Sequence, residues 1–403
     1  MKKILFLVID GLPDDKIPAL GNKTPLEAAR RINLDCFARN GLLAFFKPLF
    51  LGKLPDSEEV HFALFGYDPK KFLPGRGVLE AIGCGVKLLP KDIVLRGNLA
   101  TIDKNGLVLD RRAGRIQSGE AKVLAESLNG LKIKGVKFLI KPVYGHRLAV
   151  ILRGRGLSER ISDTDEKFIK KTRPCLPLGK NNDKACFTAR VVNEFLKTAN
   201  PILENHPLNL KRQKQGKMPA NFILLRGAGK LKNVESFQKK WGLKSGCLSL
   251  GALYRGIAKF LGMAIIKEKQ GDPFSSAYLK NKFYAAKNAL KKYDFVFCHV
   301  KGADLLAENG DFLGKKKFIE KVDKELKIFK DLKHTLLVIT ADHATSCQTK
   351  THAKGPIPLL IWGLPKKHNP GAKFTESGCL KGNLGQVKNL KILPLVKNLT
   401  SEG

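Results

Sequence analysis

Acidic and histidine side chains follow three short apolar runs of this chain, each at the point where the run ends. These residues are Asp10, Asp304, Glu308, Asp342, His343 and, nine positions later, His352. If the runs are neighbouring parallel strands, their carboxyl ends meet at the edge of the sheet where α/β proteins bind ligands. Carboxylates and imidazoles are ligands of Mn²⁺, Zn²⁺ and Mg²⁺. A single aspartate after a strand is more often a turn residue, but three such strand ends favour a two-metal site.

Asp304 and Glu308 belong to the unusual stretch HVKGADLLAENGD, which leaves a strand pattern and ends in an Asn-Gly-Asp turn. Residues four apart face the same way on a helical turn, so the two carboxylates point together at the end of the strand. Such a pair is either a solvated turn or a cation site. The residues of this stretch alone do not decide between the two.

Ser57 lies in LPDSEEVHFALFGYD, after a Pro-Asp turn and before a predicted helix. A hydroxyl there is close to backbone N–H groups and to the positive end of the helix, which suits an anion. Beside a metal site, it would indicate phosphoryl transfer. The plainer interpretation, which the local residues favour, is an N-cap with Glu58 and Glu59 complementing the helix dipole.

The apolar pattern predicts the elements that position these residues. The runs ILFLVIDG, DFVFCHV, TLLVITADH and IPLLIWG are typical of central strands in a mainly parallel sheet covered by helices on both faces. A helix is expected from Thr24 as N-cap, with Pro25 at its first position and Glu27 at the capping-box position. Gly41 is its expected stop. A second amphipathic helix, FIEKVDKELKIFKDL, separates two of the strands, and this β-α-β order predicts an α/β fold.

The middle of the chain has a different pattern. The segment VLRGNLATIDKNGLVLDRRAGRI has a KNG turn between two strand-like runs, and FLIKPVYGHRLAVILRG has the pattern of a second hairpin. We therefore expect an α/β domain built from residues 1–85 and 229–403. An α+β domain, residues 86–228, is expected to be inserted into it.

Composition sets limits on the class of protein. A chain of 403 residues with 43% hydrophobic content is an ordinary soluble protein of about two or three domains. No apolar run approaches the roughly 20 residues of a membrane helix, and the N-terminal apolar run, which Asp10 ends, is shorter than the ~7–15 residues of a signal-peptide core. We expect a cytoplasmic protein that does not enter membranes. The eight scattered cysteines contain no CxxC pair and are expected to be free thiols.

The charge is unusual, because 73 lysines and arginines face 36 acidic residues, a formal net charge of +37. Nucleic-acid or anionic-membrane binding is one explanation. The alternative is a lysine-covered surface without a specific partner. The lysines are dispersed and no nucleic-acid-binding signature is present, so we expect no nucleic-acid function. A basic protein also attracts small anions such as phosphate esters.

Longer segments, in order along nearly the whole chain, carry a resemblance to a known family. They include ILFLVIDG, NKTPLEAARRINLD, HFALFGYDP, GRGVLEAIGCGV, DRRAGRI, ISDTD, DFVFCHVKGAD and VITADHATSC. With these segments the chain resembles the archaeal-type 2,3-bisphosphoglycerate-independent phosphoglycerate mutases, members of the alkaline phosphatase superfamily. The resemblance implies an alkaline-phosphatase-like metal domain interrupted by a phosphotransfer domain.

The resemblance also implies roles for individual residues. Ser57 would be the nucleophile that takes the phosphoryl group, and His61 would complete its motif. One ion would be held by Asp10, Ser57, Asp342 and His343, and the other by Asp304, Glu308 and His352. The substrate cleft would include His146, Asp163, Asp165, Arg111, Arg112 and Arg115, with Arg226 among the catalytic groups. The family's catalytic lysine matches Lys282 counted back from DFVFCHV and Lys280 counted forward from the Gly-Asp segment.

The implied activity is the interconversion of 3-phosphoglycerate and 2-phosphoglycerate through a phosphoserine, a step of glycolysis and gluconeogenesis. It would use two divalent ions, Mn²⁺ first, with Mg²⁺, Zn²⁺ or Co²⁺ as alternatives, and no 2,3-bisphosphoglycerate. The expected partner is a small phosphorylated carboxylate. The sequence does not indicate whether the protein is a monomer or an oligomer.

The chain departs from the family pattern at several positions. They are Glu308 for a histidine, Leu305 for a glutamate, Ser275-Ser276 for Thr-Asp, Ala353 for a serine and Glu166 for a proline. These departures keep two alternatives open. One is a divergent phosphotransferase or phosphatase of the same superfamily, homoserine-kinase-like or weakly active, since a fold does not fix a function. The other is a non-catalytic member whose basic surface binds a polyanion.

Overall fold

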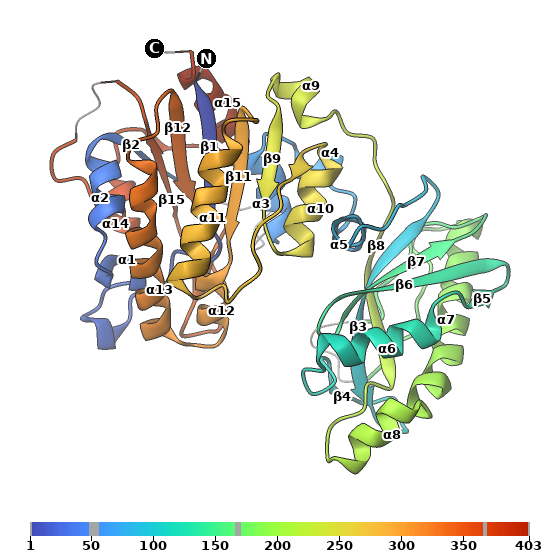
Figure 1. Ribbon diagram of the computed structural model, residues 1–403. Helices are drawn as coiled ribbons and strands as arrows, with labels where there is room; N and C mark the ends of the chain where they lie inside the picture. The colour runs from blue at the N-terminus through green and yellow to red at the C-terminus, as the bar shows by residue number, and fades with distance from the viewer. Residues whose placement is uncertain (1, 48–55, 166–170, 366–368, 402–403) are drawn as a thin grey trace. The chain divides into compact units, whose positions relative to one another are not determined.

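The computed structural model describes residues 2–47, 56–165, 171–365 and 369–401 (Figure 1). The chain forms two compact units, and each is described by itself. The first comprises Met1–Leu73, Val234–Leu250 and Ile257–Gly403, and the second comprises Pro74–Asn233 and Gly251–Gly256.

The first unit is built on an eight-stranded sheet in the order β10-β9-β11-β1-β12-β15-β2-β16. Its strands are β1 (Lys3–Ile9), β2 (Gly41–Phe46), β9 (Ser245–Leu248), β10 (Ala264–Ile265), β11 (Phe295–Val300), β12 (Thr335–Thr340), β15 (Ile357–Trp362) and β16 (Gly385–Gln386). Neighbours from β10 to β12 pair in parallel, and β15 pairs antiparallel with both β12 and β2. The predicted α/β fold is confirmed, with a mixed sheet that is mainly parallel.

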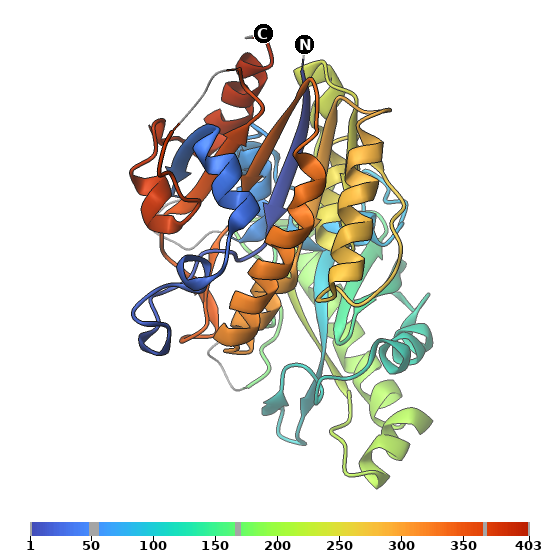
Figure 2. The ribbon, with the colours of Figure 1, turned by 60° about the vertical axis from the view of Figure 1, so that its left-hand side comes forward.

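Helices cover this sheet, and α2, α11 and α13 lie along one of its faces (Figures 1 and 2). The α-helices of the unit are α1 (Pro25–Ala28), α2 (Ile32–Arg39), α3 (Ser57–Leu64), α4 (Pro69–Phe72), α9 (Phe237–Trp241), α11 (Ser276–Ala289), α12 (Gly302–Glu308), α13 (Phe312–Glu325), α14 (Glu376–Leu380) and α15 (Ile392–Leu399). Short 3₁₀ turns are η1 (Pro18–Leu20), η2 (Leu326–Phe329) and η3 (Asn389–Lys391). The helix α10 (Ala252–Phe260) begins in the second unit and ends in the first.

The two predicted helices form, with one correction. Thr24 caps α1 through a complete capping box with Glu27, as expected. The helix does not continue to Gly41, because the chain leaves helical geometry at Ala29 and restarts as α2. The guanidinium of Arg31 donates to the carbonyl oxygens of Glu27 and Ala29 at 2.9 and 2.7 Å, which satisfies the end of α1. The second predicted helix is α13 with η2, and it lies between β11 and β12 in the expected β-α-β order.

A small hairpin follows β12 in the first unit. Its strands, β13 (Ala344–Ser346) and β14 (Thr351–Ala353), pair antiparallel with Thr345 opposite His352. The hairpin therefore presents residues from both of its arms close to the end of β12.

The second unit is an antiparallel sheet in the order β4-β3-β7-β6-β5, with β8 on the other side of β3. Its elements are α5 (Arg76–Gly83), β3 (Ile93–Ile102), β4 (Val108–Asp110), α6 (Ser118–Leu128), β5 (Lys132–Ile133), β6 (Val136–Tyr144), β7 (Arg147–Arg153), α7 (Asp183–Glu204), α8 (Pro207–Lys214) and β8 (Phe222–Gly229). Both predicted hairpins, β3–β4 and β6–β7, are confirmed. The phosphotransfer role of the segment 86–228 remains a prediction.

Two further sequence expectations concern the whole chain. None of the helices in the described ranges is long and apolar enough to cross a membrane. All eight cysteines lie in these ranges and are free thiols, as expected.

Candidate metal centre

Parallel pairing brings the ends of three strands together at one edge of the sheet. The strand β1 pairs with both β11 and β12. Asp10 follows β1 directly, Asp304 lies in the first turn of α12 after β11, and Asp342 and His343 follow β12. All four are buried. The strand-end residues that the sequence indicated are therefore neighbours in space.

The imidazole of His343 lies among these carboxylates. Its Nδ1 lies 3.1 Å from Oγ1 of Thr345, and that hydroxyl donates to Oδ1 of Asp304 at 2.8 Å. Because the hydroxyl hydrogen is used on Asp304, Nδ1–H must be the donor to Thr345, which leaves the lone pair on Nε2. Nε2 lies 3.3 Å from Oδ1 of Asp10 and 3.3 Å from Oδ2 of Asp342. Three electron-rich atoms thus face one another, an arrangement that a bound cation stabilises.

Burial and charge act differently on the carboxylates of this group. Burial, together with the charges of Asp10 and Asp304, raises the pKa of Asp342 well above its ordinary value. Burial also opposes ionisation of Asp10, but Lys301 and His299 hold the pKa of that carboxyl well below its ordinary value. Nζ of Lys301 lies 2.9 Å from Oδ2 of Asp10 and 2.8 Å from Oδ2 of Asp304. One ammonium group therefore bridges two of the three carboxylates.

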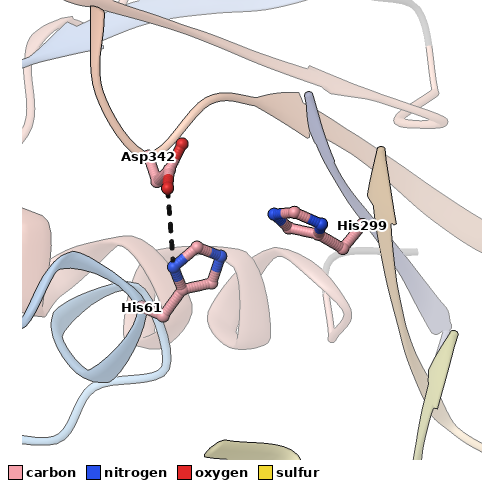
Figure 3. Close-up of side chains that lie close together, drawn as sticks. All are labelled: His61, His299 and Asp342. Atoms are coloured by element: carbon pink, nitrogen blue, oxygen red, sulfur yellow. Dashed lines mark ion pairs between the residues drawn. The ribbon is translucent and has the colours of Figure 1, made fainter. Parts of the chain in front are cut away.

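Three groups of side chains in the described residues place one ligand atom each within 4.8 Å of one another. The groups are His61, His299 and Asp342 (Figure 3); Asp304, His343 and His352; and Asp10, Asp342 and His343. The rings of His343 and His352 are stacked with centroids 3.6 Å apart. Carboxylate and imidazole donors in threes, with a position open, are a set that divalent metal ions bind.

The hydrogen bonding of Asp342 also indicates that these donors suit a cation. Oδ1 of Asp342 accepts backbone N–H groups from Gly11 and His343, at 3.4 and 3.1 Å. Its Oδ2 is fully buried and accepts no hydrogen bond from any residue in the described ranges. A buried carboxylate oxygen without a hydrogen bond raises the free energy of the folded protein unless a positive charge lies next to it. The residues present therefore fit a divalent ion.

Ser57 is not the N-cap of α3, which corrects the plainer interpretation. Asp56 occupies that position, its backbone N–H donates to Oε2 of Glu59 at 3.0 Å, and Ser57 is the first helical residue. Oγ of Ser57 lies 3.3 Å from Nε2 of His343, so the hydroxyl belongs to the centre. His61, one turn further along α3, has its Nδ1 2.8 Å from the carbonyl oxygen of Ser57. Burial and the neighbouring His299 lower the pKa of His61 to about 3, so its ring is neutral.

Glu308 is the last residue of α12 and its side chain is exposed. It belongs to none of the three groups in the described residues, although its charge does act on the half-buried ring of His352. Its role as a ligand remains a prediction. Of the other departures from the family pattern, Ser275 caps α11 through the N–H of Tyr278, and Glu166 lies outside the described residues.

Of the two candidate lysines, Lys280 is exposed and Lys282 is buried on α11. Nζ of Lys282 lies 2.6 Å from Oε2 of Glu268 and 3.3 Å from the hydroxyl of Tyr278. Burial opposes its charge, but Cys298 and Glu268 are the main groups that raise the pKa of Lys282 above its ordinary value. The ammonium is therefore held in an ion pair. Its catalytic role remains a prediction.

The second unit contains all six residues predicted for the substrate cleft. Arg111 forms an ion pair with Asp165, which also accepts from Nδ2 of Asn98 at 3.1 Å. Oδ1 of Asp163 accepts the backbone N–H of Gly227 at 2.7 Å. Arg112 and Arg115 are exposed in the turn after β4, and Arg115 has a positive φ of 57°. These contacts hold the predicted residues in place, while their binding role remains a prediction.

A cluster of arginines lies on β3, β7, β8 and α5 of this unit. Arg226 pairs in register with Arg96. Burial lowers the pKa of Arg96 to about 9, opposed by Glu80 and reinforced by the charges of Arg76, Arg226 and Arg147. Burial and nearby arginines, Arg147 first, lower the pKa of His146 to about 4. We refer to Arg76, Arg96, Arg147 and Arg226 as the arginine cluster.

Sequence reasoning assigned no role to several residues that the structure places in these sites. They are His299, Lys301 and Thr345 in the first unit and Arg76, Glu80, Arg96 and Arg147 in the second. His299 and Lys301 lie in the segment HVKGAD, which is part of the resemblance, so the sequence did contain a signal for these two residues. Alternate residues of a strand share a face, and this period puts His299 on the side of β11 that carries Phe297, which the ring of His61 also contacts.

The sheet and the carboxylate–imidazole group at its strand ends together define an α/β protein with a metal-binding centre. Comparison with known proteins gives the family. A family model described as 2,3-bisphosphoglycerate-independent phosphoglycerate mutase matches residues 38–209. A protein of that name from Archaeoglobus fulgidus is 39% identical over 98% of this chain and 97% of its own length. One from Methanocaldococcus jannaschii is 38% identical over 99% and 97%. The chain belongs to the 2,3-bisphosphoglycerate-independent phosphoglycerate mutase family.

Solved structures agree with this assignment. A Pyrococcus horikoshii protein superposes with a TM-score of 0.85 at 28% identity, covering 100% of this chain and 98% of its own. A cofactor-independent phosphoglycerate mutase from Thermoplasma acidophilum superposes with a TM-score of 0.70 at 29% identity, covering 99% and 100%. The similarity thus extends over the full length of both chains.

Proposed function

We propose that this chain is an isomerase that interconverts 3-phosphoglycerate and 2-phosphoglycerate through a phosphoserine at Ser57. The observation that carries the proposal is the position of the Ser57 hydroxyl, 3.3 Å from Nε2 of His343, among buried carboxylates. A serine placed this way is a nucleophile with a lone pair of an imidazole within reach of its proton. The names of the full-length relatives support the same activity.

Divalent ions at the centre would be held by Asp10, Asp304, Asp342, His343 and His352. When bound, they would stabilise charge on the oxygens of the transferring phosphoryl group and favour the serine alkoxide. The chain's own contribution is orientation. Thr345 fixes the ring of His343, and the backbone N–H groups of Gly11 and His343 fix Asp342. The identity of the metal, for which Mn²⁺ is our first expectation, is part of the proposal.

The arginine cluster of the second unit supports an anionic substrate. The planar guanidinium fork binds carboxylate and phosphate through paired hydrogen bonds. Glu80 forms ion pairs with Arg76 and Arg96, and the charges of Arg76, Arg226 and Arg147 also act on Arg96. A phosphorylated carboxylate is a ligand whose two charged groups such arginines recognise. We include in the proposal an alkaline-phosphatase-like first unit, with the second unit inserted as its substrate domain.

A coupled assay tests the proposal. Purified protein is supplied with 3-phosphoglycerate and a divalent ion, and 2-phosphoglycerate is converted onward by enolase. We expect metal-dependent turnover that Ser57→Ala abolishes and that Ser401→Ala, at an exposed serine near the C-terminus, preserves. Turnover equal in wild type and Ser57→Ala would exclude the phosphoserine. Metal-dependent release of inorganic phosphate without 2-phosphoglycerate would instead assign the chain to the phosphatases of the superfamily.

A further inference from the structure

The turn after β4 in the second unit holds its backbone in an unusual conformation. Three consecutive residues, Ala113, Gly114 and Arg115, have φ angles of 47°, 63° and 57°. In this left-handed region the Cβ of an ordinary residue crowds its own backbone, so alanine and arginine rarely adopt it. Such conformations persist where the surrounding structure enforces them, and they are frequent at functional sites. The contacts that enforce this turn are therefore of interest.

Part of the enforcement comes from the turn itself. Oδ1 of Asp110 accepts the backbone N–H groups of Arg112 and Gly114, at 2.6 and 3.2 Å. The N–H of Ile116 donates to the carbonyl oxygen of Arg112 at 3.2 Å. Ala113 and Ile116 are 0% and 3% exposed and belong to the hydrophobic core of the unit. These contacts leave the carbonyl of Ala113, in the middle of the turn, to a partner from outside it.

That partner is the buried side chain of Arg212 on α8, which is 3% exposed. Its Nη2 donates to the carbonyl oxygen of Ala113 at 3.0 Å. The same nitrogen and Nε donate to the carbonyl oxygen of Met218, at 2.9 and 3.1 Å. Its Nη1 forms an ion pair with Glu120 on α6. One planar guanidinium thus joins the turn to α6 and to the segment that follows α8, which the single nitrogen of a lysine does not reproduce.

The side chains of this turn are among those that the resemblance places in the substrate cleft. Arg112 and Arg115 are exposed, and Arg111, at the start of the turn, forms an ion pair with Asp165. The charge of Arg112 acts on the ring of His146. Arginines that bind a carboxylate or phosphate through two hydrogen bonds need a closely defined position. The backbone of the turn determines that position.

We propose that Arg212 is a positioning residue, which holds the turn 111–116 in its left-handed conformation and so fixes the arginines that bind the anionic substrate. The inference rests on the proposed function, because the substrate in question is phosphoglycerate. Arg212 acts through the carbonyl of Ala113 and not by contact with the substrate. Without it, only a fraction of the molecules has the turn in the binding conformation, and the apparent affinity falls by that fraction.

Steady-state kinetics of Arg212→Lys test the proposal in the enolase-coupled assay. This variant keeps the positive charge next to Glu120 but loses the fork that spans the two carbonyl groups. We expect the KM for 3-phosphoglycerate to rise about tenfold or more, with kcat within about threefold of wild type, because uniform binding is what is lost. The affinity for metal, which binds in the first unit, should not change.

The matched control is Arg31→Lys. Arg31 is also a buried arginine that donates to backbone carbonyl groups, but it lies at the end of α1 in the first unit. The same substitution there should lower stability and leave KM unchanged. The comparison therefore separates a positioning role in substrate binding from the loss of a buried contact.

The outcomes distinguish this inference from the proposed function. A folded Arg212→Lys variant with an unchanged KM would overturn the inference, and so would a fall in kcat alone. Absence of turnover in wild type would overturn the proposed function instead, and amide-hydrogen exchange of Gly114 and Ile116 then decides. Exchange about tenfold faster in Arg212→Lys supports the positioning role, and equal exchange refutes it. Should Arg212→Lys fail to fold, Glu120→Gln should raise KM about threefold, and an unchanged KM would refute the role.

Discussion

The two units of this protein present sites of opposite charge built on the same plan. In the first, the ammonium of Lys301 lies between the carboxylates of Asp10 and Asp304. In the second, the carboxylate of Glu80 lies between the guanidinium groups of Arg76 and Arg96. In each site a side chain of the opposite charge thus joins two of the main groups.

The difference lies in what completes each site. We propose that a cation completes the group of Asp10, Asp304, Asp342 and His343, whose donors are short, buried side chains held by the backbone and by Thr345. We propose that an anion completes the arginine cluster, whose donors are long side chains, of which Arg76 keeps 24% of its side chain exposed. Rigid short ligands suit a metal ion, whose geometry is fixed. Longer arginines suit a substrate that must be bound and released.

Removing Asp304 should break the first site most severely. Asp304→Asn takes away a proposed ligand and a partner of both Lys301 and Thr345. We expect metal affinity, measured by titration of the metal-free protein, to fall by more than ~100-fold. Binding of a phosphate anion to the second unit should be unchanged. The control is Asp331→Asn at an exposed aspartate. Retained metal binding in Asp304→Asn would remove this residue from the ligand set.

Removing Glu80 should have the largest effect in the second unit. Glu80→Gln leaves buried Arg96 without its opposite charge, and losing one partner of a buried pair costs about 3–5 kcal/mol. We expect urea unfolding to show a lower free energy of unfolding, with recovery when phosphate is added. Glu126→Gln, in an exposed pair with Lys122, should change stability by under about 1 kcal/mol. Equal effects of the two variants would show that Glu80 is not the internal counter-ion.

Replacing Lys301 should change metal affinity in the opposite direction to replacing Asp304. Lys301→Met removes the cation that competes with a metal ion for Asp10 and Asp304. We expect metal affinity to rise about tenfold, equivalent to about 1.4 kcal/mol, and the metal-free form to melt at a lower temperature. Lys317→Met, at an exposed lysine, should change neither quantity. A fall in metal affinity would show that Lys301 supports the ligands instead of competing.

Glu308→His should have a smaller effect at the edge of the same site. Glu308 is exposed, and its charge already acts on the ring of His352. A histidine there restores the family pattern, so we expect metal affinity to stay the same or improve by a few-fold, read by the same titration. A large loss of affinity would show that Glu308 is itself a ligand.

A weaker, pH-dependent effect should come from His146. Burial and nearby arginines lower its pKa to about 4. Between that pH and about 6.5, the unfolded state therefore binds a proton at this ring and the folded state does not. This group therefore contributes stability above about pH 6.5, and the contribution is lost as the pH falls towards 4. His146→Asn should flatten the dependence of the urea midpoint on pH in that window. An unchanged slope would mean that the pKa of His146 is the same in the folded and unfolded states.

The sequence predicted the parts of the first site that depend on strand order. Asp10, Asp342 and His343 were identifiable because each follows an apolar run, and parallel pairing brings such ends together. Lys301 and Glu80 were not, because their importance depends on which charges lie opposite them in the fold. The break between α1 and α2 was missed for a similar reason. Its carbonyl groups are satisfied by the side chain of Arg31, a contact that helical spacing does not reveal.

The hairpin β13–β14 gives the metal centre a structural consequence. A two-stranded hairpin this short is marginal by itself in water, yet His343 leads into one arm and His352 lies on the other. An ion bound by both histidines would hold the two arms of the hairpin together. Slow amide-hydrogen exchange in residues 344–353 would then report occupancy of the centre directly. Loss of the ion would loosen the hairpin, whose turn at Lys350 is already exposed, and make it easier for a protease to cleave.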